Sequence, residues 1–295
     1  MPELPDVEGF RRVLSSYGRG RRIEHVEVAD PSVLHGVSAP RLRRALEGRR
    51  FGAPRRHGKW LIAPTRDGPV LLIHFGMTGL LLRCAPGRPR HPHDRVLFTL
   101  SGGRGLRYRD QRKLQGLRLV AGEEAVADVL AGQGPDALEV DRRRFADLLT
   151  RRRGRIKAVL IDQSVVAGLG NLLADEILWR TRTPPTRPAA SFDEEECERL
   201  RTAMRRVLRS AVEAGCVPAR RSWLTGHRDT PDPDCPRCGG RLRRERIAGR
   251  TTVWCPVCQP ARAPDRRGSP RTASVPDGGM TGRRSRTPAS AGRNG

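Results

Sequence analysis

Two pairs of cysteines near the C-terminal end constrain the fold of this chain most strongly. Two residues separate the cysteines within each pair, Cys235–Cys238 and Cys255–Cys258, and sixteen residues separate the pairs. This spacing is typical of a tetrahedral zinc site in which each pair supplies one edge. The runs Arg241–Arg244 and Thr251–Trp254 suit the two strands of an intervening hairpin. Because four thiolates leave no open coordination position, we expect one structural zinc ion.

Positive charge extends along the whole chain. The 295 residues carry a net charge of +25, and the sequence pI is about 11.5. The eight arginines and two aspartates that follow Pro260 account for +6 of this charge, which leaves +19 on the preceding residues. Such an excess predicts a polyanionic partner, with nucleic acid as the leading candidate.

The sequence favours neither a membrane protein nor a secreted one. It contains no apolar run long enough to span a bilayer and no basic helix rich in aromatic residues. Acidic residues stand at Glu3, Asp6 and Glu8, where a signal peptide would be basic and then apolar. We therefore expect a cytoplasmic protein whose seven cysteines are free or bound to metal.

The pattern of apolar residues changes near the middle of the chain. A helical pattern over 5–17 is followed by short strand-like runs, typical of a β-sandwich or barrel, at 23–28, 60–63, 70–75, 80–84, 96–100, 106–109 and 117–120. After Gly132–Asp136 the pattern becomes helical near 142–151, 155–162, 171–180 and 193–213. We therefore place a domain boundary at Gly132–Asp136. The residues after Pro260 are rich in Pro, Gly, Ser, Thr and Arg and are expected to be disordered.

Two glycines lie between two of the expected helices. Gly168 and Gly170 allow two tight turns before Asn171, which we expect to cap the next helix. The first N–H groups of that helix would then be free to face a phosphate. An ordinary helical hairpin explains the same spacing equally well.

The start of the chain offers a nucleophile. Removal of Met1 would expose the secondary amine of Pro2 beside the carboxylic acid of Glu3. An α-amino group has a pKa of about 7.7–8.0, so part of it is unprotonated near neutral pH and can attack carbon. The competing interpretation is helix initiation, which Pro5 and Asp6 favour.

Lysine is rare in this arginine-rich chain and occurs only at Lys59, Lys113 and Lys157. Unlike arginine, lysine is a compact amine that can release a proton. The three positions are therefore candidates for chemistry, although coding bias explains them as well, above all at Lys113.

Taken in order, these features resemble the formamidopyrimidine-DNA glycosylase and endonuclease VIII family. The likeness covers about residues 1–259 and rests on Pro2-Glu3-Leu4-Pro5, an internal lysine, the glycine-bracketed turn and the four-cysteine hairpin. The resemblance implies an α+β multidomain fold. Its expected parts are an N-terminal β-sandwich flanked by helices at 1–133, a helix-two-turn-helix DNA-binding domain at 134–227, a zinc-finger β-hairpin at 228–260 and a disordered basic tail at 261–295.

The resemblance also implies a bifunctional DNA glycosylase and AP lyase of base-excision repair. Such an enzyme removes oxidised or ring-opened bases through an N-terminal proline Schiff base and cleaves the strand by β,δ-elimination. Its expected partner is double-stranded DNA that contains damaged bases or abasic sites, bound by a monomer in the cytoplasm at the nucleoid. The implied cofactor is one structural Zn2+, held by Cys235, Cys238, Cys255 and Cys258.

Carried onto this sequence, the family motifs assign four catalytic residues. Pro2 would attack C1′ of the damaged nucleotide, and Glu3 would move protons at the sugar. Lys59 would contact phosphate and assist β-elimination, and Arg250 would grip phosphate for the second elimination.

Five further residues match DNA-binding positions of the family. Met77 would fill the space left by a flipped base, and Arg112 would pair with the orphaned partner base. The resemblance makes Lys157 and Asn171 phosphate ligands and His93 a DNA-contacting histidine.

Two departures from the family pattern bear on the substrate. Leu114 stands where the formamidopyrimidine branch usually has an aromatic wedge, and the region Ala214–Trp223 is shorter than the loop that covers 8-oxoguanine in that branch. The sequence therefore leaves two alternatives open. One is an AP lyase or endonuclease VIII-like enzyme without 8-oxoguanine preference, and the other is a noncatalytic zinc-finger DNA-binding protein.

Overall fold

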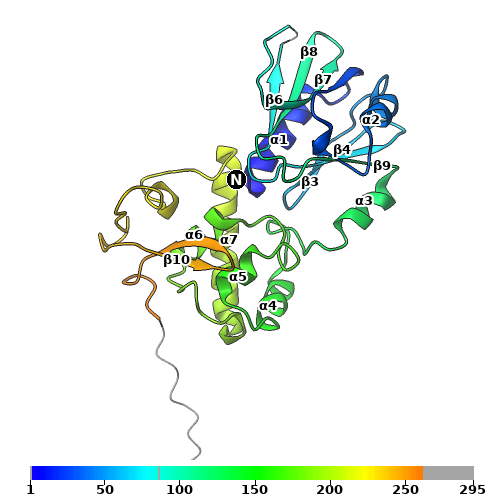
Figure 1. The fold of residues 1–295 in the computed structure, drawn as a ribbon. Coiled ribbons are helices and arrows are strands. Elements are labelled where there is room, and N and C mark those ends of the chain that lie inside the picture. The colour runs from blue at the N-terminus through cyan, green and yellow to red at the C-terminus, as the bar shows by residue number, and fades with distance from the viewer. Residues whose placement is uncertain (1, 86, 262–295) are drawn as a thin grey trace, which may run out of the picture. The chain divides into compact units, whose positions relative to one another are not determined.

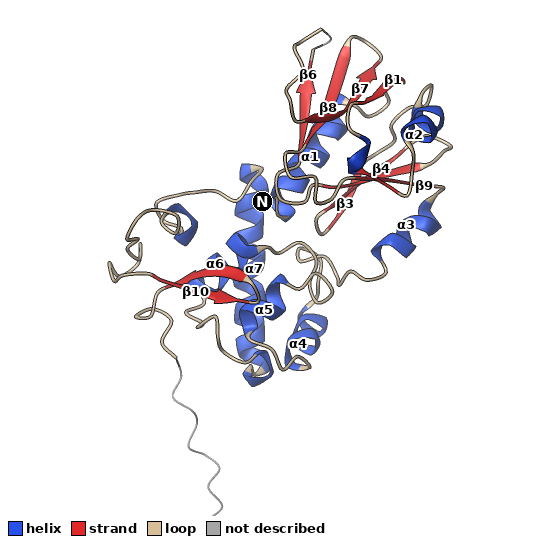
Figure 2. Cartoon of the chain, viewed as in Figure 1, coloured by secondary structure: helices blue, strands red, loops and turns tan. Residues whose placement is uncertain are grey.

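The structure is a computed structural model that describes residues 2–85 and 87–261. The described residues belong to one compact unit that ends at Ala261. Figure 1 shows its strand-rich N-terminal half and its helical C-terminal half, and Figure 2 separates helices from strands by colour. The expected disordered tail at 261–295 lies, from residue 262 on, outside the described residues.

Helix α1 (Leu4–Tyr17) begins where the N-terminal sequence favours a helix start. The Asp6 carboxylate accepts a hydrogen bond of 2.8 Å from the Glu3 N–H and closes the first turn. The helix buries Val7 and Leu14 in the core of the strands, whereas Leu4 is buried in the core of the helical half. The first residues of the chain thus connect the two cores.

Two sheets pack face to face, which confirms the predicted β-sandwich. The antiparallel first sheet contains, in order, β1 (Ile23–Val28), β7 (Asp94–Leu100), β8 (Arg104–Arg109) and β6 (Leu80–Cys84). The second sheet contains β2 (Leu34–His35), β9 (Leu117–Val120), β5 (Val70–His74), β4 (Trp60–Pro64) and β3 (Arg55–His57). Alternate residues of β7 are buried, as expected for a strand that covers a core with one face.

Two helices that the sequence patterns did not reveal flank the sandwich. Helix α2 (Ala39–Leu46) packs on β1, and α3 (Glu123–Leu130) packs on β5. Only Leu42 and Leu46 of α2 are buried, and three of its eight residues are arginines, so its apolar periodicity is too weak to detect.

The helical half contains α4 (Arg142–Thr150), α5 (Ile156–Ile161), α6 (Asn171–Arg180) and α7 (Glu194–Ala214), as predicted. A capping box begins α7, because Asp193 accepts from the Glu196 N–H while Glu196 accepts from the Asp193 N–H. Within residues 2–85 and 87–261, short 3-10 helices also lie at Pro31–Val33, Ala189–Ser191 and Leu224–Gly226. Among the described residues, no helix has the length and apolarity that crossing a membrane requires.

The zinc-finger hairpin consists of β10 (Arg243–Ile247) and β11 (Arg250–Trp254). Its two-residue turn, Ala248–Gly249, has positive φ at both positions (48° and 72°), as a type I′ turn requires. Beneath the hairpin, Trp179 and Leu224 form a small core with the cysteine knuckles. The hairpin is therefore packed on α6.

Asp136 joins the sandwich to the segment that leads into the helices. Its buried carboxylate is paired with the Arg56 guanidinium, accepts from the Gly58 N–H at 2.7 Å and accepts from the Leu138 N–H at 3.0 Å. Gly58 lies at the tip of the β3–β4 hairpin, directly before Lys59. One carboxylate thus fixes the hairpin tip against the helical half.

We predict that Asp136→Ala lowers the free energy of unfolding by about 3 kcal/mol, because it leaves the buried Gly58 N–H unpaired and leaves the Arg56 guanidinium with only the more distant carboxylate of Glu8, at 3.4 Å. Urea unfolding measures the change. The control is Asp128→Ala, which removes an exposed carboxylate of α3 and is expected to cost less than about 0.5 kcal/mol. Equal effects of the two substitutions would contradict the proposed role of Asp136.

Candidate active site

A cavity of about 270 Å3 brings together residues that lie far apart in the chain. Those from the N-terminal half are Pro2, Lys59, His74, Gly76, Met77, Leu114 and Gln115. Those from the helical half and the zinc finger are Ile161, Gln163, Gly170, Asn171 and Arg250. Of the nine candidate catalytic and DNA-binding residues, five therefore line one cavity: Pro2, Lys59, Met77, Asn171 and Arg250.

The Glu3 carboxylate caps the start of helix α6. The side chain is completely buried and accepts from the N–H groups of Gly170 (2.9 Å), Leu172 (2.8 Å) and Leu173 (3.1 Å). The positive end of the helix dipole thus faces a negative charge. Asn171 was expected to cap this helix, and that prediction is wrong. Gly170 is the N-cap residue, and the capping carboxylate comes from Glu3, far away in the sequence.

Burial and hydrogen bonding shift the pKa of Glu3 in opposite directions. Burial raises the pKa of Glu3, whereas Lys59 and the three backbone N–H groups lower it. The net shift is upward. A carboxyl group with a raised pKa gains and loses its proton closer to neutral pH, as a proton-transfer group must.

Close packing between the tip of the β3–β4 hairpin and the two-turn connection holds Lys59 at the cavity. Gly58, with φ of +53°, turns the β3–β4 hairpin so tightly against the two-turn connection that a Cβ there would lie 2.7 Å from Ala167 Cβ. Lys59 follows at once, half-buried on the cavity wall. Burial lowers the pKa of Lys59, Glu3 raises it, and Arg250 lowers it.

The two-turn connection needs its glycines. Gly168 has φ of +114°, and a Cβ there would lie 2.5 Å from the Leu4 side chain. A Cβ on Gly170 would lie 2.5 Å from the Glu3 carboxylate. The Gln163 side chain spans the connection by donating to Leu169 O and accepting from the Gly168 N–H. The absence of side chains at Gly168 and Gly170 therefore leaves room for the Leu4 and Glu3 side chains to pack against the two-turn connection.

Lys157 does not face the cavity. Its side chain is completely buried, and its ammonium group donates to Asn171 O at 3.0 Å and pairs with Asp175. The burial gives Lys157 a structural role and contradicts the phosphate contact expected for it. The Lys157 ammonium fixes Asn171, the first residue of α6. The Asn171 side chain in turn donates to Thr251 O of the zinc hairpin.

Asp175 is the centre of this buried network, and no sequence pattern indicates it. Besides Lys157, it accepts from Arg228 (2.9 Å) and from the Val253 N–H (3.2 Å). Burial is the largest influence on the pKa of both ions of the central pair. It raises the pKa of Asp175 and lowers that of Lys157. The network holds the hairpin that carries Arg250 against α6.

Met77, Arg112 and Leu114 form a group at the edge of the cavity, and Met77 and Leu114 also line it. The Arg112 guanidinium donates to the Met77 sulfur at 2.9 Å, and the Leu114 side chain is 50% exposed. Lys113, between them, has φ of +53° and pairs with Asp30. Arg112 itself does not line the cavity, but its contact with Met77 places it at the edge.

His93 lies just before β7, and the structure does not place it on the cavity. Its backbone N–H donates to His91 Nδ1, and its ring contacts Arg95. His74, by contrast, does line the cavity. Burial and the neighbouring Lys59 lower the pKa of His74 to about 4, so its ring is neutral at pH 7 and accepts from the Gly76 N–H.

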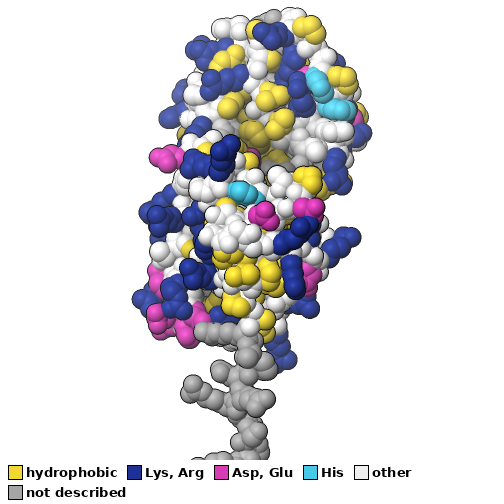
Figure 3. Space-filling model, turned by 90° about the vertical axis from the view of Figure 1, so that its left-hand side faces the viewer, with side chains coloured by type: hydrophobic (Ala, Val, Ile, Leu, Met, Phe, Trp, Pro, Cys, Tyr) yellow, Lys and Arg dark blue, Asp and Glu magenta, His cyan; other side chains and the backbone are white. Residues whose placement is uncertain are grey.

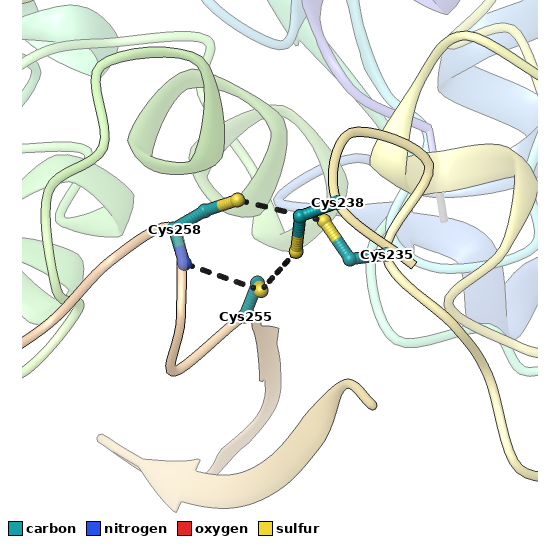
Figure 4. Close-up of side chains that lie close together, drawn as sticks. All are labelled: Cys235, Cys238, Cys255 and Cys258. Carbon is teal, nitrogen blue, oxygen red and sulfur yellow. Dashed lines mark hydrogen bonds between the residues drawn. The ribbon is translucent and has the colours of Figure 1, made fainter. Parts of the chain in front are cut away.

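The four cysteines fit one zinc ion (Figure 4). Their sulfur atoms all lie within 4.8 Å of one another. The Sγ–Sγ distances are 3.8 Å for Cys235 and Cys258 and 3.6 Å for Cys238 and Cys255. Zn–S bonds of about 2.3 Å in a tetrahedron place sulfur atoms about 3.8 Å apart, so the geometry confirms the predicted structural site.

We predict that Asp175→Asn lowers the free energy of unfolding by about 3 kcal/mol, because it leaves the buried Lys157 ammonium without its counter-ion and leaves Arg228 paired only with the exposed Asp229. The control is Glu194→Gln, which breaks an exposed ion pair and is expected to cost less than about 1 kcal/mol. Chemical denaturation compares the two. A small, equal loss in both variants would show that the network does not stabilise the fold.

Models of three protein families match successive parts of the chain. They are the formamidopyrimidine-DNA glycosylase N-terminal domain at residues 1–117, the formamidopyrimidine-DNA glycosylase H2TH domain at 131–221 and the zinc finger found in FPG and IleRS at 235–261. The three matches follow the order of the sandwich, the helices and the hairpin.

Individual proteins agree with this division. A formamidopyrimidine-DNA glycosylase of Symbiobacterium thermophilum is 39% identical over 94% of this chain and 99% of its own length. One of Heliobacterium modesticaldum is 37% identical over 88% of this chain and 100% of its own length. The solved structure of Lactococcus lactis Fpg with DNA containing an abasic site is 28% identical, with a TM-score of 0.80 over 88% of this chain and 100% of that chain. The chain belongs to the formamidopyrimidine-DNA glycosylase family.

Proposed function

We propose that this protein removes damaged bases from duplex DNA and then cleaves the strand, with Pro2 as the nucleophile. The observation that carries the proposal is the burial of the Glu3 carboxylate on the start of α6, directly beside Pro2 on the cavity wall. Burying this carboxylate is costly, and DNA binding alone does not require it. The buried acid therefore disfavours the noncatalytic alternative.

After removal of Met1, the Pro2 amine attacks C1′, and the damaged base leaves with the bonding electrons. Loss of the ring oxygen bond then gives an iminium between Pro2 and the opened sugar. Glu3, with its raised pKa, protonates the ring oxygen as the sugar opens. A preformed abasic site is in equilibrium with its open aldehyde and does not need this proton transfer. The fixed hydrogen bonds from α6 keep the Glu3 carboxylate in place during ring opening.

Lys59 and Arg250 supply positive charge for the eliminations. Both line the cavity from opposite halves of the chain. In our proposal, Lys59 contacts the phosphate that leaves in β-elimination, and Arg250 binds the phosphate that leaves in the second elimination. Asn171, on the same cavity wall at the start of α6, binds a phosphate of the DNA backbone. Lysine and arginine side chains are spread over the face of the molecule shown in Figure 3, in keeping with a polyanionic substrate.

The group of Met77, Arg112 and Leu114 at the edge of the cavity suits the space left by an extruded nucleotide. An unbranched methionine fills an irregular gap, and Leu114 offers an apolar wedge. Arg112 is free to pair with the orphaned base once its weak contact with the Met77 sulfur is broken. His93 contacts the DNA backbone farther from the cavity.

The segment that follows α7 bears on which lesions the protein can excise. Only Gly215–Trp223 separates the end of α7 at Ala214 from the 3-10 helix at Leu224, and Trp223 is buried. In our proposal this segment, anchored by the buried Trp223, does not cover a flipped base. We therefore propose ring-opened purines and abasic sites as the preferred substrates, bound by a monomer that works in the cytoplasm at the nucleoid.

We predict that Glu3→Gln slows base excision at least about 100-fold, as loss of an acid–base group does, but spares strand cleavage at a preformed abasic site. That substrate has no glycosidic bond left to break. Glu8→Gln, on the same helix, is the control and is expected to retain both activities. Single-turnover assays on the two DNA substrates measure the difference. Equal loss of both activities in Glu3→Gln would contradict the role assigned to Glu3.

We further predict that a ring-opened purine opposite cytosine is excised faster than 8-oxoguanine opposite cytosine. A ring-opened base stacks poorly, so its extrusion costs less and needs no covering loop. Single-turnover excision from matched duplexes compares the two lesions. Excision of 8-oxoguanine at an equal or greater rate would show that the short segment after α7 does not limit recognition.

A further inference from the structure

A second and larger cavity lies at the other end of α6. Its volume is about 690 Å3, and six arginines line it: Arg142, Arg180, Arg182, Arg199, Arg206 and Arg237. Two glutamates, Glu195 and Glu198, give the lining an excess of four positive charges. The ten residues of α6 rise about 15 Å, which separates this arginine pocket from the active-site cavity at Asn171.

Arg182 occupies a position that normally favours glycine. The Thr183 N–H donates to Leu178 O, and the Arg182 N–H donates to Trp179 O, so α6 ends in a Schellman motif with Arg182 as its left-handed residue. Its φ is +55°, a conformation unfavourable for a residue with a side chain. The chain thus places a guanidinium in the pocket at a conformational cost, as is typical of functional positions.

The pocket combines unpaired arginines with fixed ones. Among the described residues, no hydrogen bond or ion pair holds the guanidinium group of Arg182 or Arg206. Arg237, between two zinc ligands, lies over the Trp179 ring at 4.1 Å and donates to Trp179 O. Arg180 lies over the Trp223 ring at 4.9 Å. Such stacking orients guanidinium groups before a ligand arrives and lowers the entropy lost on binding.

We propose that the arginine pocket binds an acidic segment of a partner protein. The ligand carboxylates would pair with Arg182 and Arg206, which have no partner of their own, and with the oriented Arg237. A short peptide can also place an apolar side chain against Ala203 and the arginine stems. A DNA strand suits the pocket less well, because its phosphates are regularly spaced and some would meet Glu195 or Glu198, whereas a short peptide can turn its neutral residues toward them.

Fluorescence anisotropy with a labelled peptide that repeats Asp-Asp-Leu tests the proposal on the full chain. We expect the wild type to bind it at low ionic strength, and to bind the matching Asn-Asn-Leu peptide at least about tenfold more weakly. Arg182→Gly should weaken binding of the acidic peptide about tenfold. The same substitution should leave the unfolding midpoint unchanged or raise it, because glycine suits the left-handed position. Strand cleavage at abasic sites should not change.

Arg153→Ala is the matched control, because it removes one exposed arginine from a loop outside the pocket. It should leave peptide affinity within about twofold of the wild type, as expected of a distant, screened charge. Failure of the wild type to prefer the acidic peptide, or equal losses in the two variants, would overturn the proposal. If Arg182→Gly weakened binding of an undamaged duplex as much as that of the peptide, the pocket would belong to the DNA surface instead.

Discussion

The hydrogen bonds from the start of α6 to the Glu3 carboxylate are the interaction on which the rest of the site depends. They connect residues that are 167 to 170 positions apart in the chain. The carboxylate satisfies N–H groups that the helix itself leaves unpaired, and the helix dipole stabilises the negative charge. The same contact fixes Pro2, the neighbouring residue, on the wall of the cavity. The Glu3 carboxylate therefore both caps α6 and serves as the proton-transfer group of the proposed reaction.

Two further buried carboxylates hold the other catalytic groups around this contact. Asp136 fixes the hairpin tip that carries Lys59, and Asp175 fixes the zinc hairpin that carries Arg250. Each carboxylate pairs with a buried cation and accepts from a backbone N–H. Removing one partner from such a pair leaves an uncompensated charge, so these contacts specify one arrangement of the site. The zinc site stabilises the far end of the same hairpin.

Local patterns revealed most of the elements but not the contacts between them. The alternating pattern of β7 and the long amphipathic helix α7 were predicted correctly, because each follows a simple apolar period. Helix α2 was missed, because its arginines hide its short apolar face. The cap of α6 was assigned to Asn171, since sequence rules consider only neighbouring residues. Lys157 was expected to face DNA, because its partner Asp175 carries no local signal.

The most direct test of the account is borohydride trapping on duplex DNA with an abasic site, followed by identification of the modified residue. The account predicts a covalent adduct on the nitrogen of Pro2 in protein that has lost Met1, and no adduct at this position in protein that retains Met1. Reduction of the iminium makes the bond permanent, so the modified peptide identifies the nucleophile. An adduct on Lys59, or no adduct with protein that begins at Pro2, would contradict it.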